Sequence, residues 1–568
     1  MAPSAWAQRA GESAVAAASD AFGVSVGDER IGLYAEDNVR GFSPITAGNR
    51  RIEGMYIDLQ GPGISPRLTS GSAIRVGIAA IGYPFPAPSG VVDYRLRPSG
   101  DETVFSVVAG LHPYGGAYAE FDAQLPIASE RASVAFGAGY SRAEFQDGRF
   151  AETTNAAIIA RFSTETMSLT PFYSYVHNTG DSAPIMVTAG AHLPPEFEPG
   201  RFTGQSWADR LQRTHTYGAL GHVDLSDAWQ LRFGAFESRS TRYASFVDLF
   251  TNVARDGSAR YIAISEPELP ARWTSGEARL EWSHRGEAFA HQAILSSRAR
   301  DKEIELGGGA SADLGAAQVG EPNPAPEPDF VFQPTTLNSV TQSSLGLAYV
   351  GRWRNLAEFN IGAQSTSYDQ RVMRNAGADE TQAEEILYAA SLAVTPLPWL
   401  AFYGGLTTGL EETAAPPASA LNRDDAPPAS ATEQWDAGVR LTFGDTRIVA
   451  GVFETERPYF ATDPANVYGN LGLRRTRGAE ISIVARPLEG LRIVGGVVHY
   501  DALVEGEAVE LGRAGPRPLG STPLFARLDL DYGLAAVPGL SAQLAIAHTG
   551  DIVASTAPYA DLGGEQLE

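Results

Sequence analysis

A two-residue alternation of side chains recurs along most of this chain and limits its possible folds more than any other feature. In the clearest segment one face carries Val134, Phe136, Ala138 and Tyr140, and the other carries Ala135, Gly137, Gly139 and Ser141. This period is typical of β-strands whose two faces meet different surroundings. From about residue 103 onward the segments have roughly the 8–12 residues that a tilted strand needs to cross a bilayer.

The connections between these segments alternate in length. Tight turns are expected at 126–131, 163–166, 226–228 and 396–398, and long loops at 178–213, 241–272, 307–338 and 411–432. Outer-membrane barrels have short turns on one rim and long loops on the other. A sheet in lipid must also close on itself, because each backbone amide needs a partner within the protein. The pattern predicts an all-β chain whose main part, 101–568, is a large antiparallel transmembrane β-barrel.

Composition excludes several classes of function. The chain has no cysteine, so disulfides, thiolate metal sites and cysteine nucleophiles are excluded. Its 43 Lys and Arg oppose 67 Asp and Glu, a formal charge of −24, which argues against a nucleic-acid partner. The mean hydropathy of −0.14 is that of a soluble protein but leaves the membrane question open, because the lipid-facing and lumen-facing residues of a transmembrane barrel average out as polar.

Enzyme chemistry finds no support in the sequence. The nine histidines are scattered and show no His-Glu-x-x-His spacing. There is no Gly-x-Ser-x-Gly elbow and no phosphate-binding loop of the Walker type. We therefore predict that the protein is not an enzyme.

Two segments before the barrel do not share its rhythm. Residues 1–19 are Ala-rich, and 5–7 (Ala-Trp-Ala) resemble the cleavage site of a secretory signal, so we expect a signal-peptide remnant and a flexible N-terminus. Residues 20–100 are Gly- and Arg-rich and predict a small mixed α/β domain. A wide barrel either encloses an open channel or is filled by a plug.

Short motifs in 20–100 resemble the plug of TonB-dependent receptors. The matching stretches are Asn-Val-Arg-Gly-Phe at 38–42, Arg-Ile-Glu-Gly-Met-Tyr-Ile-Asp at 51–58, Ile-Arg-Val-Gly at 74–77 and Pro-Ser-Gly-Val-Val-Asp-Tyr at 88–94. The barrel part adds 432–438, 457–460, 468–472 and 477–480, which resemble late-barrel signatures of ferric-siderophore receptors. The resemblance implies a 22-stranded type of barrel with a shortened plug in its lumen.

The chain departs from this family in three respects. The plug is short, and no clear TonB box precedes Asp20, which leaves only 12–19 for one. Asp93 stands where the family has asparagine. The chain ends at 563–568 without a terminal aromatic residue, so we expect the C-terminal strands of the barrel to be missing.

The resemblance also implies the site residues. Arg40 and Arg75 are expected to meet the barrel residues Glu433 and Glu480 in a plug–barrel lock, since guanidinium–carboxylate pairs are strong and directional. The alternative is that both arginines bond only to turns of the plug. Four residues are candidates for ligand binding: Arg40, Arg67, Tyr83 and Phe85. For the two aromatic residues, on a proline-stiffened turn, packing under the barrel wall is the alternative.

The function implied is energy-coupled import across the bacterial outer membrane. The expected partners are the TonB complex of the inner membrane, a siderophore-like ligand, and outer-membrane lipid and lipopolysaccharide, without nucleic acid. No cofactor is expected, since any iron arrives with the ligand. The alternatives are a passive channel, TonB-dependent uptake of a carbohydrate or cobalamin, and a secreted β-rich adhesin, which would have polar residues on both strand faces.

Overall fold

The fold is taken from a computed structural model of the chain. It describes residues 13–553 except for short internal stretches, namely 27–28, 60–62, 99–101, 113, 129–130, 181–182, 184, 190–194, 196–197, 375–376, 418–419, 423–424, 464, 535 and 538–539. The expected signal remnant at 5–7 and the chain end at 563–568 lie outside the described residues.

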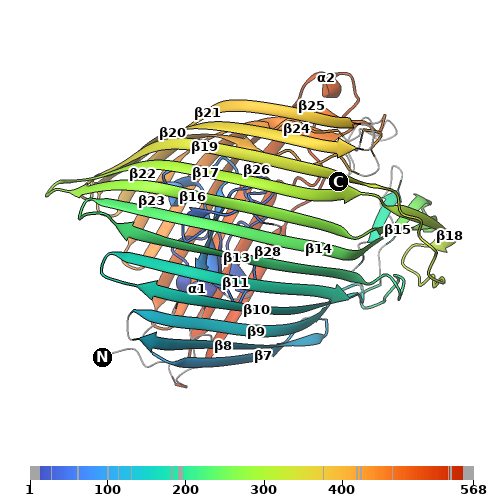
Figure 1. The fold of residues 1–568 in the computed structure, drawn as a ribbon, viewed down its shortest axis with the longest axis horizontal. Helices are drawn as coiled ribbons and strands as arrows, with labels where there is room; N and C mark the ends of the chain where they lie inside the picture. Colours follow the sequence, from blue (N-terminus) through green and yellow to red (C-terminus); the bar gives the residue numbers. More distant parts are fainter. Residues whose placement is uncertain are drawn as a thin grey trace.

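The plug is a single twisted sheet inside the barrel (Figure 1). Its order is β2-β1-β5-β6-β3-β4, with β1 at Val24–Val26, β2 at Glu29–Ile31, β3 at Arg50–Ile52, β4 at Met55–Tyr56, β5 at Thr69–Arg75 and β6 at Val91–Leu96. All pairs are antiparallel except β3 with β6. The helical part among the described residues before β7 is small, namely α1 (Ala14–Ala17) and the 3-10 turn η1 (Gly77–Ala80). The predicted mixed α/β plug is therefore mostly β.

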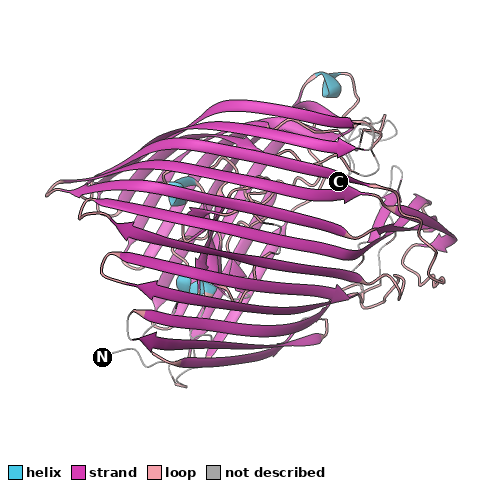
Figure 2. Ribbon diagram, viewed as in Figure 1, coloured by secondary structure: helices cyan, strands magenta, loops and turns pink. Residues whose placement is uncertain are grey.

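The strands β7 to β28 follow one another in the order of a closed barrel. Figures 1 and 2 show the long wall strands running side by side around the plug. The first half comprises β7 (Val104–Leu111), β8 (Gly116–Ala128), β9 (Ala132–Glu144), β10 (Phe150–Ser163), β11 (Met167–Gly180), β12 (Ile185–Ala189), β13 (Arg210–Asp224), β14 (Trp229–Val253), β15 (Ser258–Glu266), β16 (Leu269–Arg285), β17 (Phe289–Gly307) and β18 (Ala310–Gln318). The second half comprises β19 (Thr335–Trp353), β20 (Ala357–Arg374), β21 (Gly377–Leu397), β22 (Leu400–Glu411), β23 (Ser430–Phe443), β24 (Thr446–Thr462), β25 (Tyr468–Leu488), β26 (Leu491–Glu505), β27 (Leu524–Gly533) and β28 (Ser541–Thr549), with α2 (Glu507–Glu510) before β27. In this closed order the last strand, β28, stands next to the first wall strand, β7. Every residue of β28 is solvent-exposed.

Three of these strands stand apart from the barrel wall. β15 pairs with β14 and β18, and β12 runs parallel to β14, so that the far end of β14 continues into a small second sheet. The wall itself is joined by direct pairing of β11 with β13, β14 with β16 and β17 with β19. In Figure 1 this second sheet projects at the end of the barrel where β15 and β18 are labelled.

The predicted alternation is present in the wall. On β9, Phe136 and Tyr140 are exposed on the outer face, whereas Ala135, Gly137 and Gly139 are buried on the lumen face. Small residues suit the lumen face here, because a Cβ at Gly137 would lie only 2.4 Å from Oδ1 of Asp122. The outer face is apolar and the inner face meets the plug.

The two rims also differ as expected. Short connections join β10 to β11, β13 to β14, β16 to β17 and β25 to β26, and the long ones lie at the opposite ends of the strands. Of the expected long loops, 241–272 is mostly strand, because β14 and β15 extend beyond the wall. No helix in the described part of the chain is long and apolar enough to cross a membrane.

Candidate functional site

A tight turn in the plug aims Arg40 at the barrel wall. Val39 and Phe42 bond to each other through their backbones, and Oδ1 of Asn38 accepts from the amide of Gly41 at 3.1 Å. Arg40 adopts a φ of +53° and Gly41 one of +83°. The positive φ favours glycine at Gly41, and a Cβ there would also lie 2.6 Å from Nη2 of Arg474 and displace that guanidinium.

Arg40 forms a two-point ion pair with Glu480 of β25. Its Nη2 donates to Oε1 at 2.6 Å and its Nε donates to Oε2 at 3.2 Å, and both side chains are buried. Nη1 lies 3.4 Å from Oδ2 of Asp436, and the guanidinium carbon lies 4.3 Å from the ring centroid of Phe453. Burial opposes the charge of Arg40, but Glu480, Tyr34 and Asp436 together outweigh it and raise the pKa of Arg40 well above its usual value. Arg40 therefore stays charged.

Tyr34 completes this cluster from the plug side. Its hydroxyl donates to Oε2 of Glu480. Burial first, and then the charge of Glu480, raise the pKa of Tyr34 well above its usual value, so the hydroxyl remains a donor. Around it, buried apolar residues of plug and wall pack together, among them Phe22, Val39 and Val498.

The other two residues of the expected lock lie elsewhere. Glu433 is exposed on the same face of β23 as Trp435, whereas Asp436 is on the lumen side and contacts Arg40. Arg75 makes no ion pair with Glu433 or Glu480 among the described residues. It lines a cavity on the tight-turn side of the plug together with Asp20. The structure thus brings together Arg40, Glu480 and Asp436, and the placement expected for Glu433 and Arg75 is wrong.

Arg67, expected to bind ligand, is instead enclosed by wall carboxylates. Its Nη2 lies 2.7 Å from Oε1 of Glu120, and its Nη1 lies 2.7 Å from Oδ2 of Asp122, both on β8. Only 1% of Arg67 is exposed. Arg97 approaches the same Asp122 at 3.6 Å. Arg67 thus forms a second ion-pair cluster between plug and wall, which the sequence motifs did not indicate.

The two aromatic candidates pack against the wall rather than facing the loops. Phe85 is buried with Ile294 and Ala348. The carbonyl of Tyr83 accepts from Nδ2 of Asn360 at 2.7 Å. Burial raises the pKa of the Tyr83 hydroxyl. These positions support the alternative of packing under the wall.

A cavity of about 740 Å³ lies between the plug and the long-loop side of the barrel. The wall contributes residues from the loop-side parts of β16, β17 and β19 and the residue that follows β22. These are Trp273 on β16, Arg300, Lys302 and Leu306 on β17, Asn338 on β19, and Glu412 after β22. Nη1 of Arg300 lies 3.0 Å from Oδ2 of Asp58 in the plug and 3.2 Å from Oε2 of Glu412, and Lys302 pairs with the same Glu412. Charged side chains of both signs therefore stand beside apolar ones in this cavity.

An adjoining cavity of about 390 Å³ exposes the plug motif itself. Two guanidinium groups of the wall contact the ring of Phe42, with Cζ of Arg457 at 5.1 Å and Cζ of Arg474 at 4.5 Å from its centroid. Arg457 belongs to the late-barrel stretch at 457–460. The plug motif and the barrel motif thus meet on the loop side.

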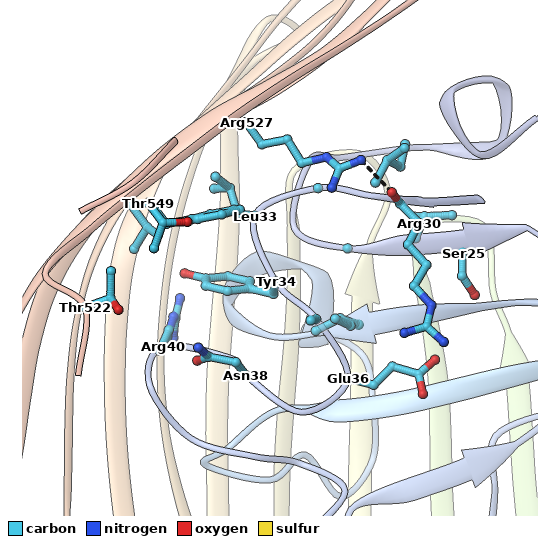
Figure 3. Close-up of a pocket in the computed structure, with 18 of the residues that line it drawn as sticks. Ser25, Arg30, Leu33, Tyr34, Glu36, Asn38, Arg40, Thr522, Arg527 and Thr549 are labelled. Carbon is cyan, nitrogen blue, oxygen red and sulfur yellow. Dashed lines mark hydrogen bonds between the residues drawn. The ribbon is translucent and has the colours of Figure 1, made fainter. Parts of the chain in front are cut away.

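A third cavity, of about 480 Å³, lies beside the lock between the plug and β26 to β28. Figure 3 shows Tyr34 and Arg40 on one side of it and Thr522 and Thr549 of the wall on the other. Nη2 of Arg527 donates to the carbonyl of Arg30 at 2.6 Å and holds β2 against the wall. A cavity of about 550 Å³ on the tight-turn side shares Gly23 to Ser25 with it. The strand β1 therefore separates spaces on the two sides of the plug.

The described residues offer no evident site for a metal ion bound by the chain itself. Within the described ranges, His, Asp and Glu side chains form no group of three or more that suits a metal ion.

Comparison with known proteins gave consistent matches. The family model described as "TonB dependent receptor-like, beta-barrel" matches residues 155–564. The ferrichrome receptor FcuA of Yersinia enterocolitica is 25% identical over 204 residues, which are 34% of this chain and only 25% of FcuA. The match thus spans a quarter of the length of that relative.

Solved structures share the fold at low sequence identity. BauA, the ferric preacinetobactin receptor of Acinetobacter baumannii, has a TM-score of 0.73 and 16% identity, covering 94% of this chain and 81% of BauA. The pyoverdine receptor FpvA of Pseudomonas aeruginosa has a TM-score of 0.74 and 14% identity, covering 93% of this chain and 80% of FpvA.

Proposed function

Since this chain belongs to the TonB-dependent receptors of the bacterial outer membrane, we propose that it imports a ferric siderophore by energy-coupled movement of its plug. The energy would come through the TonB complex of the inner membrane. The relatives that bind ferrichrome, preacinetobactin and pyoverdine support an iron chelate as the ligand class. No resident cofactor is needed, because iron enters as part of the ligand.

The observation that carries this proposal is the loop-side cavity of about 740 Å³. Its size is within the roughly 300–1,000 Å³ of small-molecule sites. The plug forms its floor, and loop ends of the wall form its sides, so that a ligand arriving from outside would contact both. Trp273 and Leu306 offer apolar surface, and Lys302 offers a cation for the oxygen atoms of a chelate.

The contacts of the plug favour active import over a passive channel. The plug is held by buried ion pairs of Arg40 and Arg67 with the wall. Breaking one partner of a buried pair typically costs about 3–5 kcal/mol. A passive channel has no need for such a closure, whereas an energised receptor has a partner that supplies the work to open it.

Ligand binding to the purified protein tests the proposal. We expect at least one ferric chelate from a panel of hydroxamate, catecholate and carboxylate types to quench the tryptophan fluorescence of the protein, and to quench it less in Trp273→Phe, because Trp273 lines the cavity. Lys302→Gln should weaken that binding about ten-fold, the effect of losing one hydrogen bond to a charged group. Arg272→Gln is the matched control, because Arg272 lies on the exposed face of the neighbouring strand. Binding of cobalamin or an oligosaccharide, with no binding of any iron chelate, would overturn the iron assignment.

A further inference from the structure

Three of the cavities between the plug and the wall form a series along the strand β1. The loop-side cavity and the cavity beside the lock share Ser25, Arg30 and Glu36 in their linings. The cavity beside the lock in turn shares Gly23 to Ser25 with the cavity of about 550 Å³ on the tight-turn side. Figure 3 shows Ser25, Arg30 and Glu36 together on one side of the middle cavity. The series therefore runs from the loop side to the tight-turn side past one short strand.

The last cavity of this series, the tight-turn cavity, is lined by three arginines. Arg75 ends β5 and Arg95 lies on β6 of the plug, and Arg492 lies on β26 of the wall. Within the described ranges, none of the three has a carboxylate at ion-pair distance, and none donates a side-chain hydrogen bond. A chain with a formal charge of −24 thus gathers three unpaired cations around one cavity.

The carboxylates near this cavity are engaged by other groups. Asp20 is the one acidic residue among the described residues that line it, and its Oδ1 accepts from the amide of Phe22 at 3.0 Å. Asp531 stands opposite Arg492 in the register of β26 and β27, and its Oδ2 accepts from the hydroxyl of Ser13 at 3.0 Å. The lining therefore carries an excess of positive charge that the described part of the chain does not neutralise.

The rest of the lining consists mostly of small residues and hydroxyl groups. The hydroxyls of Ser25 and Ser72 bond to each other at 2.8 Å, and the hydroxyl of Ser70 makes only long bonds of 3.4 and 3.5 Å to carbonyls of β6. Guanidinium groups bind anionic oxygen atoms with short, directional hydrogen bonds. The volume of about 550 Å³ is within the roughly 300–1,000 Å³ of small-molecule sites. This cavity suits a small molecule with anionic oxygen atoms on its surface.

We propose that the tight-turn cavity is an exit-side subsite for the imported chelate, and that this chelate carries a net negative charge. The chelate passes along β1 from the loop side, and its anionic oxygen atoms contact Arg75, Arg95 and Arg492 once β1 has moved. A ferric tris-catecholate has this charge, whereas a ferric tris-hydroxamate is neutral. The inference rests on the proposed function and narrows the cargo from ferric chelates in general to anionic ones.

Uptake by cells that express the full chain tests the charge of the cargo. A radioactive ferric tris-catecholate and a radioactive neutral ferric tris-hydroxamate are compared at saturating concentration. We expect the tris-catecholate to enter at least about ten-fold faster, the effect of one hydrogen bond to a charged group. Equal uptake of the neutral chelate would overturn the inference and leave the proposed function standing. If no iron chelate of either charge binds or enters, the proposed function fails, and the inference fails with it.

Variants locate the effect in the tight-turn cavity. Arg75→Gln/Arg492→Gln should lower the maximal rate of tris-catecholate uptake about ten-fold, because the cavity no longer compensates the charge of the chelate. The Kd at the loop side should change by less than about two-fold, since neither arginine lines the loop-side cavity. Arg75→Lys/Arg492→Lys keeps the charge and should restore much of the rate. Arg440→Gln is the matched control, because Arg440 is half-buried on the tight-turn part of β23 but does not line the cavity.

Two further measurements keep the test decisive. Arg95→Gln replaces an exposed side chain and serves where the double variant does not fold, with a smaller loss of uptake rate expected. Thermal unfolding in inorganic phosphate and in chloride, at equal ionic strength, separates the cargo from a free anion. A rise of Tm in phosphate that the double variant loses, together with unchanged uptake by that variant, would assign the cavity to a free anion. Unchanged uptake in both Arg95→Gln and the double variant would likewise overturn the exit-side role.

Discussion

At the scale of single residues, the plug is held by guanidinium groups that meet wall carboxylates. Arg40 meets Glu480 on one side of the lumen, and Arg67 meets Glu120 and Asp122 on β8. These pairs are buried, so removing one partner leaves a charge without compensation. The same chemistry at an exposed site would contribute far less.

Glu480→Gln tests the first pair. We expect the plug–wall interface to lose about 3 kcal/mol, because Arg40 keeps only Asp436 as an anionic neighbour. Protease cleavage within the plug and thermal unfolding measure this loss. Glu433→Gln is the matched control, because Glu433 is exposed on the outer face of β23 and does not contact the plug arginine. It should change the free energy of unfolding by less than about 0.5 kcal/mol.

Arg67→Gln distinguishes a structural role from ligand binding. Loss of the guanidinium takes away the cation that lies 2.7 Å from both Glu120 and Asp122, and should destabilise the plug by about 3 kcal/mol. The Kd for a ferric chelate should change by less than about two-fold, because Arg67 does not line the loop-side cavity. A large rise in Kd without a loss of stability would contradict this assignment.

Part of the site could be read from the sequence, and part could not. The motif at 38–42 indicated Arg40, and the stretch at 477–480 indicated Glu480. The error at Glu433 was avoidable, since period-two alternation places it on the face of Trp435 and places Asp436 on the opposite one. The partners of Arg67 were not predictable, because the register between the plug and β8 has no signature in either segment.

At the scale of elements, the N-terminal segment 13–22 is docked against the barrel wall. The hydroxyl of Ser13 bonds to Asp531 at 3.0 Å, and Nη1 of Arg447 donates to the carbonyl of Ser19 at 2.6 Å. Oδ1 of Asp20 accepts from the amide of Phe22 at 3.0 Å. This segment precedes β1, which separates the cavities on the two sides of the plug.

The docking of this segment should depend on pH through Asp20. Burial raises the pKa of Asp20 above 3.8, with Glu480 adding to the rise and Arg75 and Arg447 opposing it. A raised pKa means that the docked form favours the protonated acid. Docking is therefore strongest at low pH and weakens as pH rises through 3.8 toward the higher pKa of the docked form.

Asp20→Asn should remove this dependence. The amide keeps an oxygen for Phe22 but carries no charge, so hydrogen exchange of segment 13–22 at neutral pH should be slower than in the unaltered protein. The difference should vanish at acid pH, where Asp20 is protonated. Faster exchange in the variant at neutral pH would contradict the argument.

The elements of the barrel were mostly predictable, because strand length and alternation are local properties. The tight turns and the loop-side rim appear where expected. The segment 241–272 was wrongly expected to be a loop, since its prolines, Pro267 and Pro270, and its acidic residues are typical of loops. Its strands exist because β14 and β15 pair beyond the wall, and that pairing is a tertiary property.

At the scale of the whole molecule, a sheet fills the lumen of a barrel and leaves cavities on both of its sides. The cavities of about 740 Å³ and 550 Å³ lie on the loop side and the tight-turn side, respectively. The plug strands and their contacts with the wall separate these two cavities. Import of a ligand therefore requires the plug to move relative to the wall.

A cross-link between the plug and the wall tests this requirement most directly. The chain has no cysteine, so the two cysteines of an introduced pair have no other thiol of the chain to react with. The amide of Ser65 in the plug donates to the hydroxyl of Ser174 on β11 at 2.8 Å, and both residues are fully buried. Ser344 and Thr366, whose hydroxyls lie 2.9 Å apart on adjacent wall strands, provide the matched control within the wall.

The measurement is the uptake of a radioactive ferric chelate by cells that express one or the other cysteine pair. Uptake is measured first with the disulfide formed and then after a reductant has opened it. We expect oxidised Ser65→Cys/Ser174→Cys to bind the chelate without transporting it, and reductant to restore transport. Oxidised Ser344→Cys/Thr366→Cys should transport normally. Full transport with the plug cross-linked to the wall would contradict import by plug movement.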